Sequence, residues 1–137
     1  MNETQIYLAV FLAVLTMGLH SNMDRNQIGN AAQIRVSGPA VFLLMLMVPV
    51  NLASTLGPMA VAVWSMWKLS FGYSLLAVAS SFVALFILGF PLHRSVYPKF
   101  NGPDGREHFP IAVGLNLLTK AVSVGSAAVV AYNLWEM

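Results

Sequence analysis

The chain has 137 residues, of which 58% are hydrophobic and only 9% are charged, and its formal net charge is +2. A soluble domain carries about 25% charged residues, so this chain lacks the charge to coat a surface that faces water, and we expect lipid to be its solvent. The small net charge, without a basic stripe, argues against nucleic acid as a partner, and the absence of cysteine excludes disulfides, thiolate metal sites and cysteine nucleophiles.

Four apolar stretches predict one all-α domain, an integral membrane four-helix bundle with four transmembrane spans. Nothing before the first stretch resembles the positive region of a signal peptide, because the only early charge is Glu3, and no small-x-small cleavage site follows. We therefore expect the first stretch to be a retained span. The predicted spans are residues 5–20, 40–66, 69–92 and 110–135, and the long loops are residues 21–39 and 93–109.

The second stretch carries Pro49 and the pair Gly57-Pro58, where kinks are expected because proline lacks the backbone donor. Ending this span at Gly57 is an alternative, but it would place Lys68 deep inside the next span. A turn at residues 64–69 is favoured, since tryptophan and lysine are typical of the membrane–water interface.

The two long loops are richer in basic residues than the rest of the chain. The middle turn has only Lys68, whereas the long loops carry five basic residues. The positive-inside rule then places the long loops in the cytoplasm and both termini outside. The five residues are Arg25, Arg35, Arg94, Lys99 and Arg106.

Two rows of small residues, spaced three and four apart, predict surfaces for close helix packing. Packing within one chain is favoured, and packing against another subunit is the alternative. Because four spans enclose little interior, we expect a homo-oligomer or a place in a larger complex with other membrane subunits. The rows are Ser70, Ser74, Ala77, Ser81 and Ala84 in the third span and Ala121, Gly125 and Ala128 in the fourth.

Lys120 is the most informative single residue, because an ionisable group inside a span is costly and is a functional candidate. No predicted span contains an aspartate or glutamate beside it, so we expect amides, carbonyls, water or lipid headgroups as partners. Asn51, Asn116 and Ser123 complete a polar track that is the predicted internal ligand site. The alternative is that Lys120 only snorkels along its helix.

Three histidines, His20, His93 and His108, fall at the predicted cytoplasmic face. Together with Asp104 and Glu107 they could bind a metal, but no histidine pair has helical ligand spacing and no HExxH motif is present. An ordinary interfacial role is favoured, and we assign no metal and no cofactor.

The third loop interleaves aromatic residues with Arg94, Lys99 and Arg106. This pattern is typical of an interface anchor, and it could also bind an anionic headgroup or a substrate carboxylate. Arg94 and Arg106 are therefore further candidate ligand-binding residues.

The segment Ala31-Ala32-Gln33-Ile34-Arg35-Val36-Ser37-Gly38-Pro39, followed by an apolar helix, resembles the start of the second helix in the membrane-associated eicosanoid and glutathione metabolism (MAPEG) family. The resemblance implies a trimer that binds glutathione between subunits, with Arg106 placed like the family's thiol-activating arginine. The family's signature arginine, asparagine and glutamate are replaced by Ala31, Arg35 and Gly38.

Three functional hypotheses follow. The first is an accessory or structural subunit of a membrane assembly, favoured because no Ser-His-Asp arrangement, phosphate loop or dinucleotide fingerprint is present. The second is a MAPEG-like trimeric enzyme or lipid-binding protein that uses glutathione or a lipophilic ligand. The third is a small oligomeric channel or transporter with Lys120 in the pathway.

Overall fold

A computed structural model describes residues 1–33, 48–92, 94 and 105–137, and the side chains among these except those of residues 25–33 and 105–113. The described chain is all-α and forms a packed four-helix bundle, which confirms the predicted class. Its helices are α1 (Glu3–Gln33), α3 (Val48–Lys68), α4 (Phe71–Pro91) and α6 (Gly105–Glu136).

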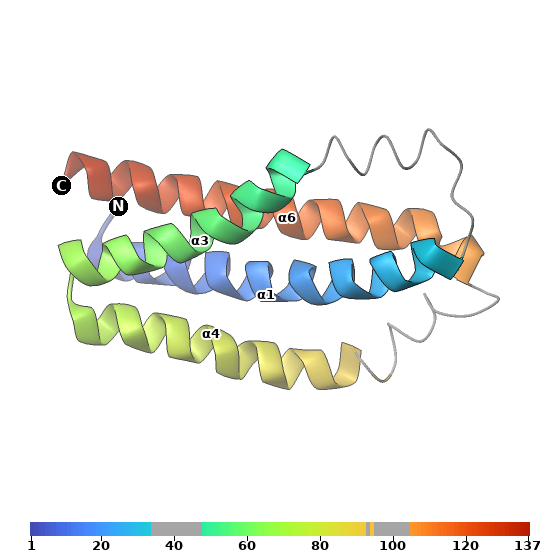
Figure 1. Cartoon of the computed structure of the whole chain (residues 1–137). Helices are drawn as coiled ribbons and strands as arrows, with labels where there is room; N and C mark the ends of the chain where they lie inside the picture. The colour runs from blue at the N-terminus through green and yellow to red at the C-terminus, as the bar shows by residue number, and fades with distance from the viewer. Residues whose placement is uncertain (34–47, 93, 95–104) are drawn as a thin grey trace.

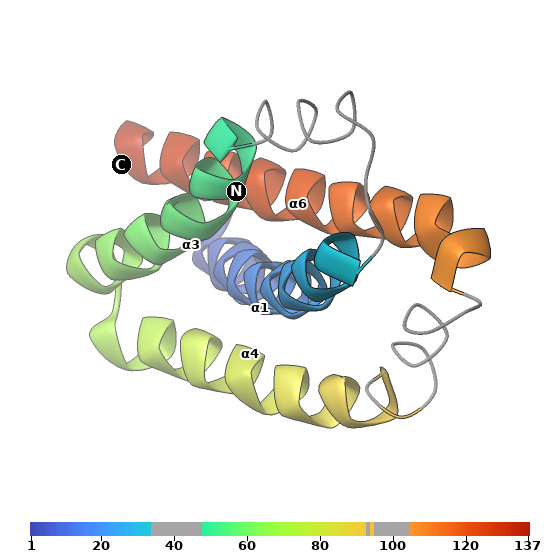
Figure 2. The ribbon, with the colours of Figure 1, turned by 45° about the vertical axis from the view of Figure 1, so that its right-hand side comes forward.

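Helix α1 is the central element of the bundle, and α3, α4 and α6 all pack against it (Figure 2). Both termini lie at the same end, where α3 also turns into α4 (Figure 1). Burial reflects this arrangement. Of the most apolar segment of α1, 39% is buried inside the bundle, whereas only 11% of the corresponding segment of α4 is buried. The remaining surface of α4 is apolar and suits contact with lipid.

Three helices are long and apolar enough to cross a membrane: Glu3–Asp24, Phe71–Pro91 and Gly114–Glu136. The described part of α3 is not apolar enough, since polar residues such as Asn51 and Ser54 interrupt it. The protein is thus a small helical membrane protein with three candidate spans, and residues 40–47 of the predicted second span lie outside the described part.

The chain turns between the middle helices later than the predicted residues 64–69, because α3 continues to Lys68 and α4 begins at Phe71, which leaves residues 69–70 for the turn. The first loop is corrected. Residues 21–33, assigned to that loop, continue α1 without interruption, and residues 105–109 likewise belong to α6. The segment 21–33 is polar, so apolar length alone ended the predicted helix too early.

The two rows of small residues have different outcomes. In α4, Ser74, Ala77 and Ser81 are buried, which confirms packing within the chain. In α6, the residues Ala121, Gly125 and Ala128 are exposed, so the prediction that they pack within one chain is wrong. The buried face of α6 instead follows another row with spacing of three and four: Asn116, Lys120, Ser123, Ala127, Val130 and Leu134.

The contact between α1 and α4, called here the apolar seam, depends on close approach. A Cβ atom added to Gly18 would overlap the side chain of Leu85, so glycine lets the two helices come together. Nearer the termini, the rings of Tyr7 and Tyr73 lie with centroids 5.8 Å apart. The Tyr7 hydroxyl accepts a hydrogen bond from the Ser70 backbone N–H at 3.2 Å, which ties α1 to the turn before α4.

Candidate functional site

Polar side chains from α1, α3 and α6 meet on the other side of α1, and we call this cluster the polar junction. Each helix places its members one turn apart, so they share a face. Five of its seven members are buried, and the other two, Asn51 and Asp24, are partly exposed. The members are His20 and Asp24 of α1, Asn51 and Ser54 of α3, and Asn116, Lys120 and Ser123 of α6.

Lys120 forms an ion pair within the bundle. Its Nζ donates to Asp24 Oδ1 at 2.8 Å and also to Asn51 Oδ1. Asn116 Nδ2 donates to the same Asp24 oxygen at 2.7 Å. The Lys120 residue is only 2% exposed, whereas the Asp24 side chain is 28% exposed. One carboxylate therefore ties α1 to α6, and the lysine adds α3 to the junction.

Pro58 explains the second half of the junction. Within an α-helix the N–H of residue 58 would bond to the carbonyl of residue 54, but proline has no N–H. The freed Ser54 carbonyl instead accepts hydrogen bonds from Ser123 Oγ at 2.9 Å and from His20 Nε2 at 3.0 Å. Neighbouring helices thus satisfy the backbone group that the proline leaves open, as bundles in lipid require.

Lys120 lies six residues into the span Gly114–Glu136, about 9 Å from its loop-side end. Side chains of helical residues lean toward the N-terminus, which for α6 is the loop side. Asp24 is the last residue of the α1 span, on that same side. The lysine therefore reaches toward the interface, as the snorkelling alternative proposed, but it does so between helices and ends on a carboxylate.

The structure brings the predicted polar track together, since Asn51, Lys120 and Asn116 share partners and Ser123 lies one turn further along α6. The expectation that no carboxylate pairs with Lys120 is wrong. Asp24 was assigned to a loop, and its place four residues after His20 on a continued helix was the signal that could have found it. The matching signal for Ser54 was its position four residues before Pro58.

Of the predicted ligand-binding residues from the loops, Arg94 is described with its side chain, and it lies away from this site. Arg94 lies at the end of α4, exposed, with its guanidinium 4.9 Å from the Phe90 ring centroid. Arg106 belongs to α6, but its side chain is outside the described residues, as are those of His93 and His108. Within the described part of the chain, no group of three histidine or acidic side chains could hold a metal.

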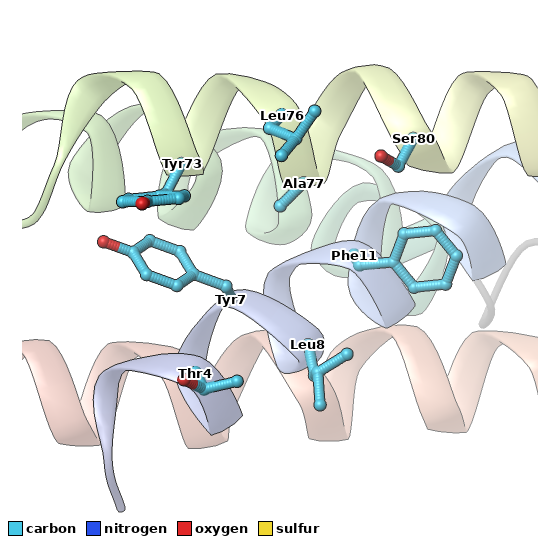
Figure 3. A pocket seen from close by; sticks show the side chains of 8 residues that line it. All are labelled: Thr4, Tyr7, Leu8, Phe11, Tyr73, Leu76, Ala77 and Ser80. Carbon is cyan, nitrogen blue, oxygen red and sulfur yellow. The ribbon is translucent and has the colours of Figure 1, made fainter.

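An apolar groove of about 340 Å³ opens between α1 and α4 near the termini (Figure 3). Phe11 and Leu76 lie along its walls, and Tyr7 and Tyr73, whose ring planes are inclined by 43°, lie toward one end (Figure 3). This groove has no charged lining residue, so its chemistry suits an acyl chain or an apolar side chain. The full lining is Thr4, Tyr7, Leu8, Phe11, Tyr73, Leu76, Ala77 and Ser80.

Comparison with protein-family models, with curated proteins and with solved structures finds no match for this chain. The site must therefore be interpreted from its own chemistry. Its charged groups neutralise one another within the chain, which is the arrangement expected where ions are buried against lipid.

Proposed function

We propose that this protein is an accessory or structural subunit of a membrane assembly, with residues 40–66 as a fourth span and both termini outside the cytoplasm. The observation that carries the proposal is the exposed row Ala121, Gly125 and Ala128 on α6, taken together with the closed polar junction on the opposite face of that helix. No described atom beyond the helix itself lies within 4 Å of the position that a Cβ of Gly125 would take.

A row of small residues on the outer face of a helix is better suited to packing against another helix than to contact with lipid chains. Association of helices in membranes depends on van der Waals packing, and small side chains let two backbones approach closely. The opposite face of α6 is already occupied by the polar junction and by Ala127, Val130 and Leu134. The exposed row therefore supports a contact with a helix of another subunit.

The polar junction supports the same proposal, because the described partners of its charged groups lie within the chain. The Lys120 ammonium is bound by Asp24 and Asn51 of the same chain and is buried, so it is not presented to a pathway between subunits. This arrangement favours a role in holding the three helices together. Because the Lys120 ammonium is buried, an anion channel lined by Lys120 is the least supported of the three candidate functions.

Native mass spectrometry after extraction in a mild detergent tests the proposal. We expect a complex that contains this chain and other membrane proteins in fixed stoichiometry, and we expect Gly125→Leu to release the chain from it. Gly72→Leu is the matched control, because Gly72 is also exposed with no described atom within 4 Å. A lone chain or a homo-oligomer at every detergent concentration would contradict the proposal.

The second candidate is a MAPEG-like homotrimer that binds glutathione or a lipophilic ligand. The exposed α6 row favours it equally, because the row could meet a second copy of this chain, and the apolar groove suits a lipophilic ligand. The segment 31–39 and the Arg106 side chain, on which the resemblance depends, lie outside the described side chains. A ligand that binds the native state must stabilise it, so a Tm unchanged by millimolar glutathione would exclude the glutathione version.

A further inference from the structure

His20 brings to the polar junction a buried acceptor atom that the described hydrogen bonds leave open. His20 is fully buried, and its Nδ1 atom has no hydrogen-bond partner among the described residues. The atom facing it is Asp24 Oδ2, at 3.5 Å, which is longer than a hydrogen bond of this kind. The ring nitrogen and the carboxylate oxygen therefore face each other without a completed bond.

The other ring nitrogen fixes the protonation state of this face. His20 Nε2 lies 3.0 Å from the Ser54 carbonyl oxygen, and a carbonyl can only accept. Nε2 must therefore carry a proton, and in a neutral imidazole the second nitrogen then carries a lone pair. Because Pro58 removes the helical donor to Ser54, this carbonyl is held open for the ring, and the tautomer is set by the backbone.

Two lone-pair acceptors, Nδ1 and Oδ2, thus face each other at the contact between α1, α3 and α6. Leaving such acceptors unsatisfied is costly, and one proton placed between them would satisfy both. Asp24 Oδ1 already accepts from Lys120 and Asn116, so the open capacity of the carboxylate lies toward His20. The 28% exposure of the Asp24 side chain gives the pair a route to the surface.

We propose that His20 Nδ1 and Asp24 Oδ2 form a proton-binding site inside the bundle. One proton from water adds to the Nδ1 lone pair, an N–H bond forms and donates to Oδ2, and the junction gains one positive charge. The proposal goes beyond a structural subunit, because the contact between α1, α3 and α6 would bind a proton and would therefore respond to pH.

Among the described side chains, the charged groups next to His20 come from α1 and α6. Asp24 of α1 attracts the incoming proton, and Lys120 of α6 opposes it. From α3 the ring meets Ser54, with Asn51 one turn away, and neither titrates. On α4 the described titratable group is Tyr73, which pairs with Tyr7 about 20 Å along α1 from His20. Arg94, beyond α4, lies over Phe90 at the exposed surface.

The test is nitrogen-15 NMR of the histidine rings in the full chain, reconstituted in lipid nanodiscs, between about pH 5 and pH 8. The His20 signals are assigned by their loss in His20→Gln, and His93→Gln serves as a control that leaves them in place. At alkaline pH we expect Nε2 protonated and Nδ1 bare, and on acidification we expect Nδ1 to gain its proton. If Nδ1 of the unmodified chain already carries a proton at alkaline pH, that result alone would overturn the proposal.

Asp24→Asn sharpens the test. The new amide can still accept from Lys120 and can donate its N–H to His20 Nδ1, so it satisfies the ring without a proton. We expect the pH range over which Nδ1 gains its proton to change in this variant. An unchanged His20 titration in Asp24→Asn would overturn the proposal. These measurements use the isolated chain, so their outcome is independent of whether a partner subunit is found.

Discussion

The two sides of α1 solve the problem of helix association in lipid in different ways. On one side, the polar junction joins α1, α3 and α6 through charged and hydrogen-bonding groups, with Lys120 and Asp24 at its centre. On the other, the apolar seam joins α1 to α4 through Gly18, Leu85 and the buried small residues of α4. The junction is held by the ion pair between Lys120 and Asp24, whereas the seam is held by close van der Waals packing of the two helices.

The difference has an energetic consequence. Charges buried among lipid-facing helices are tolerable only when matched, so any other register of the junction would leave an ion or a carbonyl without a partner. If α4 slides or tilts, the seam loses dispersion contacts and one hydrogen bond at its terminal end, from the Ser70 N–H to the Tyr7 hydroxyl, but it leaves no ion without a partner. The junction therefore specifies how three helices align, while the seam contributes proximity.

The largest expected effect comes from breaking the ion pair. Lys120→Met removes the cation and leaves the Asp24 carboxylate with only neutral donors among its described partners on α6. We expect a loss of about 2–3 kcal/mol in the free energy of unfolding, below the range for fully buried pairs because Asp24 is partly exposed. Unfolding by SDS in mixed micelles, followed by circular dichroism, measures it. Lys68→Met is the control, since Lys68 is exposed at the end of α3, and an equal loss in both variants would remove the distinction.

A smaller effect is expected from the apolar seam. Gly18→Ala places a methyl group against Leu85, whose side chain must shift to make room, so we expect a loss of about 1 kcal/mol after the gain in helix propensity is subtracted. Gly89→Ala, with no described atom within 4 Å, is the matched control and should be neutral or slightly stabilising. Leu85→Ala in the Gly18→Ala background should restore part of the loss. Equal stabilities of the two glycine variants would contradict close packing at Gly18.

The smallest effect separates the two halves of the junction. Ser123→Ala removes one of the two donors to the Ser54 carbonyl but leaves His20 in place. We expect a loss of about 0.6 kcal/mol, typical of a single hydrogen bond between membrane helices. Ser126→Ala on the same helix provides the comparison, measured by the same unfolding assay. A Ser123→Ala loss as large as that of Lys120→Met would mean that the carbonyl, and not the ion pair, dominates the junction.

Composition was sufficient to predict the all-α membrane class, because only lipid can solvate a chain with so little charge. Helical spacing placed Asn116, Lys120 and Ser123 on one face, and Asn51 of the neighbouring apolar stretch was added to the same predicted polar track. The method failed where a helix leaves the apolar region. Apolar length ended the first helix at His20, whereas the backbone continues to Gln33 and carries Asp24 to the lysine.

The choice of buried face on α6 was wrong for a different physical reason. Small residues predict close packing, but they do not say against what, and the row at Ala121, Gly125 and Ala128 faces outward. The polar row took the interior because leaving Lys120 and Asn116 in contact with lipid would cost more than exposing alanine and glycine. In a membrane, the polar residues decide which way a helix turns.

A double-mutant cycle on Lys120 and Asp24 tests the central claim most directly. The free energies of unfolding of Lys120→Met, Asp24→Asn and the double variant are compared with that of the unmodified chain in the same micelles. If the ion pair joins α1 to α6, the double variant loses less than the sum of the single losses by about 1 kcal/mol or more. Losses that add to within about 0.5 kcal/mol would show that the two residues act independently, and would contradict the account.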